Sequence, residues 1–138
     1  MEPVTSHESR AAESAESPHK GKTGLARVWN AFLYSLAGLS AAFRHEDAFR
    51  QEVFLAAILV PAALFLPANG VGKALMVASV LLVLMVELLN SAVEATVDRV
   101  SLEDHRLAKR AKDFASAAVM MSLATVGLVW LAVLLPRL

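Results

Sequence analysis

The sequence contains no cysteine, and its formal net charge at neutral pH is zero. The absence of cysteine excludes disulfides, thiolate nucleophiles and zinc–thiolate sites. The balanced charge gives no argument for a basic surface that binds nucleic acid. Hydrophobic residues, in contrast, make up 57 % of the 138 residues, and the mean hydropathy is +0.53. A chain of this length is expected to form one domain, and its apolar composition predicts a membrane protein.

The first part of the chain, residues 1–23, lacks an apolar run and is rich in Ser, Glu, Ala and His. This composition predicts a disordered tail and does not fit a signal peptide. Residues 24–138 are therefore expected to form the membrane-embedded domain. Within it, residues 25–43 repeat apolar side chains at helical spacing, which predicts an amphipathic helix lying in the membrane interface.

Three apolar runs follow, and each can cross a bilayer. The predicted transmembrane helices are about 49–68, 71–97 and 114–135. Lys73 is the basic residue near the turn between the first two runs, whereas the polar stretch after the second run is basic. Its basic residues are Arg99, Arg106, Lys109, Arg110 and Lys112. The positive-inside rule then predicts a cytoplasmic amino terminus and an outside carboxyl terminus. The expected fold class is an all-α integral membrane protein with three spans.

The second apolar run carries a row of polar side chains. At 100° per residue they fall on one helix face, and they are Glu87, Asn90, Ser91, Glu94 and Asp98. Ionisable groups within a span usually face a polar interior or a functional site. Two carboxylates and an amide, with a lysine nearby, suit a magnesium–nucleotide site. The deeper carboxylate, that of Glu87, suits a general base for a lipid hydroxyl.

The same residue pattern fits other functions. A single Glu within a span can hydrogen-bond a neighbouring helix and only fix packing, as in a structural helper subunit. Glu87 and Glu94 could also form the relay of a small transporter or proton pathway. Three spans would then have to oligomerise to enclose a path. The residue pattern alone leaves these alternatives open.

The segment 87–99, ELLNSAVEATVDR, closely resembles the signature of the prokaryotic diacylglycerol kinases, which are small integral membrane enzymes unrelated to soluble kinases. Further blocks agree in order and spacing. They are EDAFRQE at 46–52, EDH at 103–105, RAKD at 110–113 and SAA at 116–118. The resemblance covers about residues 24–135.

The resemblance implies a homotrimer in the bacterial inner membrane, with active sites at the cytoplasmic interface that are shared between neighbouring subunits. The implied reaction transfers the γ-phosphate of ATP, with Mg²⁺, to the free hydroxyl of diacylglycerol and gives phosphatidic acid. Some relatives phosphorylate undecaprenol instead. The EDAFRQE block and the Asn90–Ser91 pair look more like the diacylglycerol branch.

The resemblance also implies the roles of individual residues. Glu87 would be the catalytic base, and Glu46 and Glu94 would hold Mg²⁺ and the phosphates. The implied supporting residues are Asn90 and Asp98. The positions that match the ATP site are Arg27, Tyr34, Glu46, Glu94, Glu103, His105, Lys112 and Asp113. Those that match the lipid site are Arg27, Glu87, Ser116 and Trp130. Ser40 replaces a basic residue of close relatives, so one lipid-headgroup contact is expected to be missing.

Overall fold

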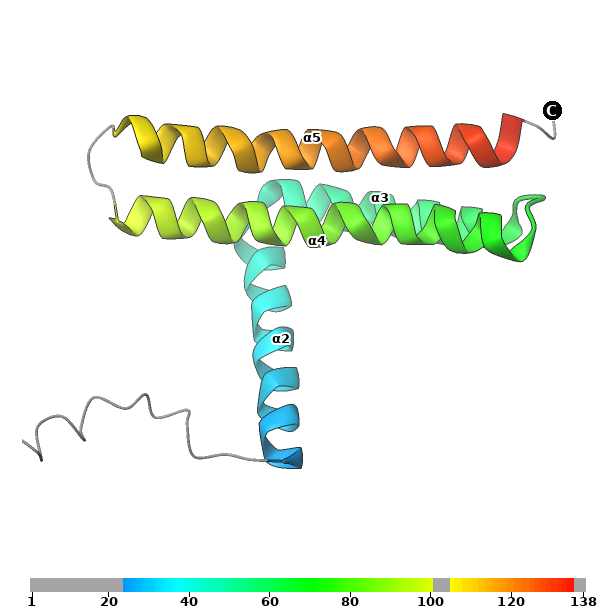
Figure 1. Ribbon diagram of the computed structural model, residues 1–138. Helices are drawn as coiled ribbons and strands as arrows, with labels where there is room; N and C mark the ends of the chain where they lie inside the picture. Colours follow the sequence, from blue (N-terminus) through cyan, green and yellow to red (C-terminus); the bar gives the residue numbers. More distant parts are fainter. Residues whose placement is uncertain (1–23, 101–104, 136–138) are drawn as a thin grey trace, which may run out of the picture. The chain divides into compact units, whose positions relative to one another are not determined.

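The computed structural model describes residues 24–100 and 105–135, and this part of the chain is helical (Figure 1). The predicted tail at 1–23 and the predicted site residue Glu103 lie outside the described residues. The helices are α2 (Leu25–His45), α3 (Asp47–Phe65), α4 (Gly70–Val100) and α5 (Arg106–Leu134). The predicted all-α class is confirmed.

Helices α3, α4 and α5 are each long and apolar enough to cross a membrane, which confirms the three predicted spans. α4 packs against both α3 and α5, and α4 and α5 run antiparallel (Figure 1). Many large apolar side chains of the three helices, such as Phe54, Leu89 and Leu128, are exposed in the single chain. Such a surface suits a surrounding of lipid or of further membrane helices.

The packed face of α4 is a stripe at helical spacing. Met76, Val80 and Val83 are buried, and Glu87 follows them on the same face at 4 % exposure. Spacings of three and four residues place side chains one above another on a helix, so the apolar stripe leads directly to this carboxylate. α3 contributes the buried Phe49, Ala56 and Ala63 to the core.

The helix ends differ from the expected spans by a few residues. α3 ends at Phe65, because the following Leu66 precedes a proline and has an extended backbone with ψ 151°. α4 continues to Val100, and α5 begins at Arg106, where His105 caps the helix by accepting a hydrogen bond from the Leu107 N–H at 3.3 Å. Much of the polar stretch after the second run is therefore helical.

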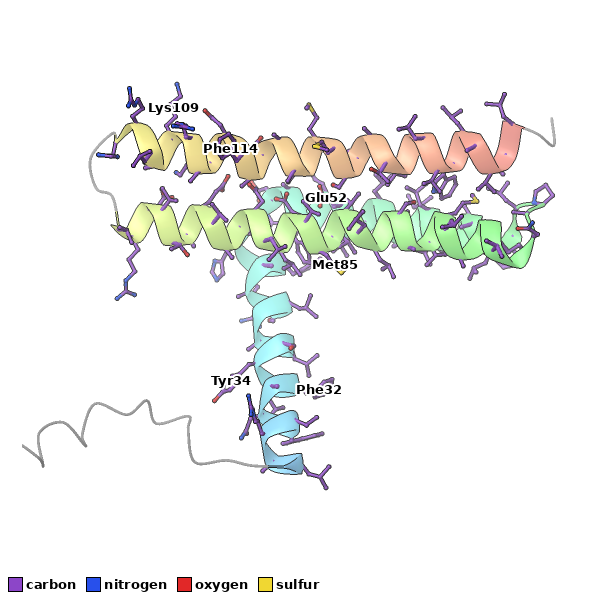
Figure 2. All side chains as sticks on the ribbon, viewed as in Figure 1. Phe32, Tyr34, Glu52, Met85, Lys109 and Phe114 are labelled. Carbon is purple, nitrogen blue, oxygen red and sulfur yellow. The ribbon has the colours of Figure 1, made fainter. Side chains whose placement is uncertain are left out.

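α2 is amphipathic, and Figure 2 shows Phe32 and Tyr34 on opposite sides of it. Its large apolar side chains are exposed, including Trp29, which contacts the Phe32 ring at 5.7 Å between centroids. The chain divides between Gly38 and Leu39 into two units, so α2 begins in one unit and ends in the other. An exposed apolar stripe is the feature that an interfacial helix buries in a membrane.

The first turn of α4 packs closely against the end of α5. A Cβ atom added to Gly72 would lie 2.8 Å from Val133 Cγ1 of α5. The Gly72 N–H donates to Asn69 Oδ1 at 2.7 Å, which caps the start of α4. Lys73 Nζ donates to the Leu64 carbonyl at 2.6 Å, in the last turn of α3. These contacts fix the end of the bundle opposite the polar residues.

Candidate active site

Glu87 is the buried centre of the polar region. It is 4 % exposed, and the Asn90 side chain, one helical turn later on α4, hydrogen-bonds to it. A carboxylate buried at this depth must be balanced by hydrogen bonds or positive charge. The predicted polar face of the second span therefore turns toward the inside of the bundle at this position.

Further carboxylates surround Glu87. Its charge interacts with those of Glu52, Glu94 and Glu46. Glu46 directly precedes α3 and Glu52 lies in its first half, whereas Glu87 and Glu94 come from the second half of α4. Like charges at close range repel, and more strongly in surroundings of low dielectric constant. A positive charge near Glu87 would relieve part of that repulsion.

Glu52 belongs to the EDAFRQE block but is not among the predicted site residues. Its Oε2 atom is buried and has no hydrogen-bond partner among the described residues. Glu52 also lines a cavity of about 170 Å³ between α3, α4 and α5, whose other walls are apolar. The apolar lining residues are Leu55, Ala56, Leu59, Val80, Val83, Leu123 and Val126. Figure 2 labels Glu52 where these helices lie together. The sequence did indicate a special position, because Glu52 is an ionisable residue three positions after Phe49, at the start of the first predicted span.

Asp98 and Lys112 join α4 to α5 at the same end of the bundle. Asp98 Oδ1 lies 2.5 Å from Lys112 Nζ, and Glu94 also acts electrostatically on this lysine. Both side chains of the ion pair are partly exposed, at 64 % for Asp98 and 40 % for Lys112. The structure thus brings together Glu94, Asp98 and Lys112, as the polar face and the nearby lysine suggested. Asp113, the next residue, is exposed.

The remaining predicted residues fall into three groups. Asn90 Oδ1 and Trp130 Nε1 are buried without a hydrogen-bond partner among the described residues, as is Ser91 Oγ. Ser116 is exposed on α5, and His105 caps that helix. The predicted site residues before the unit boundary are Arg27 and Tyr34, both exposed on α2.

A preassembled metal centre is absent from the part of the chain that the structure describes, because no three His, Asp or Glu side chains are grouped closely enough to hold an ion. The predicted Mg²⁺ ligands are only two, Glu46 and Glu94, and both are half-buried. Mg²⁺ commonly binds one or two carboxylates and takes its other ligands from phosphates and water. The donor set therefore fits an ion that arrives with a nucleotide.

The fold and the site define a small multi-pass membrane protein whose buried carboxylate, Glu87, is influenced electrostatically by further carboxylates. The family model described as prokaryotic diacylglycerol kinase matches residues 33–134. The chain belongs to this family.

Three curated relatives show how far the similarity extends. The diacylglycerol kinase of Pseudomonas aeruginosa is 56 % identical over 86 % of this chain and 97 % of the relative. The diacylglycerol kinase of Haemophilus influenzae is 53 % identical over 78 % of this chain and 92 % of the relative. The Escherichia coli K12 diacylglycerol kinase is 44 % identical over 78 % of this chain and 88 % of the relative.

Proposed function

We propose that this protein is a diacylglycerol kinase, which transfers the γ-phosphate of ATP to the hydroxyl of diacylglycerol and releases phosphatidic acid and ADP. The observation that carries the proposal is the 56 % identity to a diacylglycerol kinase over most of both chains. The buried Glu87, on which Glu94 and Glu46 act electrostatically, supports a site for this chemistry within the helices. Family membership favours this function over the transporter and helper-subunit alternatives.

Glu87 acts as the general base. Its carboxylate takes the proton of the lipid hydroxyl as that oxygen attacks the γ-phosphorus, and the bond from the γ-phosphorus to the bridging oxygen of ADP breaks. The Asn90 amide hydrogen-bonds to Glu87 and holds its orientation. Phosphoryl transfer depends mostly on the positions and charges of the reacting groups. A carboxylate that is oriented by a side chain of the same helix therefore suits a general base.

Glu46 and Glu94 would hold Mg²⁺, which would neutralise charge on the nucleotide phosphates. Lys112 lies beside Asp98 and Glu94 and contacts the phosphates directly. Asp98 orients this lysine through their ion pair. Arg27, Tyr34, Glu103, His105 and Asp113 contribute to the ATP site, while Ser116 and Trp130 contribute to the lipid site.

The active enzyme is a homotrimer in the bacterial inner membrane, with its amino terminus and active sites on the cytoplasmic side. The exposed apolar surface of α3, α4 and α5 supports burial against lipid and neighbouring subunits. The basic residues between the second and third spans support the orientation. The exposed apolar stripe of α2 supports its place in the interface.

The proposal is tested by measuring ATP consumption of the purified protein in mixed micelles with diacylglycerol, undecaprenol or no added lipid. We expect turnover with diacylglycerol and formation of phosphatidic acid. Turnover with undecaprenol alone would keep the mechanism and change the substrate. Folded protein without lipid-dependent turnover at any Mg²⁺ concentration would overturn the kinase assignment.

A further inference from the structure

The corner between α2 and α3 consists of a single residue, Glu46. α2 ends at His45 and α3 begins at Asp47. Glu46 has an extended backbone, with φ −107° and ψ 111°, and its side chain forms no capping hydrogen bond to α3. The direction of the Glu46 carboxylate is therefore set by the backbone of the corner and by the groups that hold this backbone.

Arg50 contacts both sides of this corner. Its Nη1 atom donates to the carbonyls of Phe43 at 3.2 Å and Arg44 at 3.0 Å, in the last turn of α2. Its Nη2 atom forms an ion pair with Asp47 in the first turn of α3. The Arg50 backbone N–H donates to the Glu46 carbonyl at 3.2 Å. One side chain thus bridges the end of one helix and the start of the next.

The chemistry of these contacts suits arginine. The last carbonyls of a helix lack partners within the helix and carry partial negative charge, so a cation there is favourable. The planar guanidinium presents several N–H donors in a fixed fork and can bind two carbonyls and a carboxylate together. The compact ammonium of lysine cannot reproduce this fixed geometry.

We propose that Arg50 is a positioning residue for nucleotide binding, which fixes the corner so that Glu46 faces the metal–phosphate site. This inference rests on the proposed function, because it assumes that Glu46 binds the Mg²⁺–nucleotide. Arg50 itself does not touch the nucleotide. The corner also has a separate support, because the rings of Phe43 and Phe54 meet edge to face at 6.1 Å. Variants of Arg50 are thus expected to fold.

The test uses Arg50→Gln, Arg50→Lys, Glu46→Gln and the double variant Arg50→Gln/Glu46→Gln, all assayed in mixed micelles. We expect Arg50→Gln to raise the KM for Mg²⁺–ATP about tenfold, the size of a lost charged hydrogen bond, and to leave the KM for diacylglycerol unchanged. Arg50→Lys should fall between the wild type and Arg50→Gln. Because Arg50 acts through Glu46, the double variant should have the KM of Glu46→Gln alone.

Arg44→Gln is the matched control, because it removes the same charge from the same corner but leaves the Arg44 carbonyl that Arg50 binds. We expect this variant to keep the wild-type KM for Mg²⁺–ATP. Thermal unfolding in the same micelles measures the folded fraction of each variant. This fraction corrects the apparent kcat for unfolded protein, whereas the KM does not depend on the amount of folded protein.

Three results would overturn the inference, and they have different meanings. If the two single-variant effects multiply in the double variant, Arg50 does not act through Glu46, and the proposed function stands. If Arg50→Gln lowers the apparent kcat only in proportion to the folded fraction and changes neither KM, the role of Arg50 is only structural. If Glu46→Gln has an ordinary Mg²⁺–ATP dependence, the proposed role of Glu46 is wrong and the role of Arg50 falls with it.

Discussion

At the scale of single residues, Glu87 combines two properties that conflict in water-free surroundings. It carries an ionisable group, and it continues the buried stripe of Val80 and Val83. A buried acid surrounded by other acids is unfavourable for folding alone. The arrangement therefore supports the proposed role of Glu87 as the general base over a role in packing.

Glu87→Gln is expected to lower kcat at least about 10²-fold, because the amide cannot accept the hydroxyl proton. Assembly and thermal stability should be nearly unchanged, since glutamine keeps the shape and removes the repulsion from nearby carboxylates. The measurement is phosphatidic acid formation together with thermal unfolding in the same micelles.

Ser79→Ala is the matched control for Glu87→Gln. Ser79 is also buried on α4, and its hydroxyl donates to the Met76 carbonyl at 2.8 Å, away from the carboxylate cluster. This variant should keep its turnover. Near-normal turnover of Glu87→Gln would contradict the assignment of the base and favour a packing role.

Glu94→Gln is expected to raise the Mg²⁺ concentration that gives half-maximal activity, because one of the two proposed metal-binding carboxylates is lost. Additional Mg²⁺ should restore part of the rate. The measurement is a Mg²⁺ titration at fixed ATP and lipid, with the KM for diacylglycerol as the internal control. An unchanged Mg²⁺ titration curve would show that Glu94 does not bind the metal.

The shared face of the residues on α4 could be predicted from the sequence, whereas the surroundings of Glu52 and Arg50 at the start of α3 could not. Glu87, Glu94 and Asp98 share one face because of the helical repeat, which needs no knowledge of other helices. Glu52 and Arg50 stand in a continuous charge run without such a repeat. Their surroundings depend on how the α2–α3 corner turns and on which helix packs against it.

At the scale of helices, the contact between α4 and α5 depends on Gly72. Gly72→Ala is expected to lower the free energy of unfolding by about 1–3 kcal/mol, the usual effect of overpacking. The added Cβ atom would lie 2.8 Å from Val133 Cγ1, and a β-branched side chain has little rotamer freedom with which to move away. The measurement is thermal unfolding in micelles.

Gly127→Ala is the control for this prediction, because a Cβ atom added to this helical glycine meets nothing within 4 Å. It should maintain or raise stability, since alanine favours a helix over glycine by roughly 1 kcal/mol. Adding Val133→Ala to Gly72→Ala should recover part of the loss. Equal stability of both glycine variants would contradict the close contact.

The ends of the helices were harder to predict than their existence. Hydropathy identifies the part of a helix that lipid can surround, but a helix continues wherever its backbone hydrogen bonds continue. Lys and Arg are good helix formers, so α5 can begin at Arg106, well before the apolar run. As a result, Lys112 projects from a helix, where Asp98 of α4 can reach it.

At the scale of the whole molecule, removal of residues 1–22 is expected to leave the kcat and both KM values unchanged. The family match begins only at residue 33, and the resemblance in the sequence begins at about residue 24. The measurement compares the shortened and full chains in the micelle assay at equal protein concentration. A large loss of activity would show that the first segment contributes to the site.

Composition alone predicted the class of the whole molecule, because a chain that is 57 % hydrophobic requires a membrane to cover it. Assembly could not be predicted in the same way. The contacts between subunits depend on matching surfaces of several copies, and exposed apolar residues such as Leu89 suit lipid and a neighbouring helix equally well.

The length of α4 has a mechanical consequence. Its 31 residues span about 46 Å, more than the roughly 30 Å of hydrocarbon in a bilayer. Glu87 and Glu94 belong to this one continuous helix, so the bilayer thickness sets their depth relative to the glycerol of a lipid substrate. A thicker or thinner bilayer is expected to tilt or shift the helix and to move Glu87, the proposed base, relative to the lipid hydroxyl. The rate of phosphorylation should therefore depend on the thickness of the surrounding bilayer.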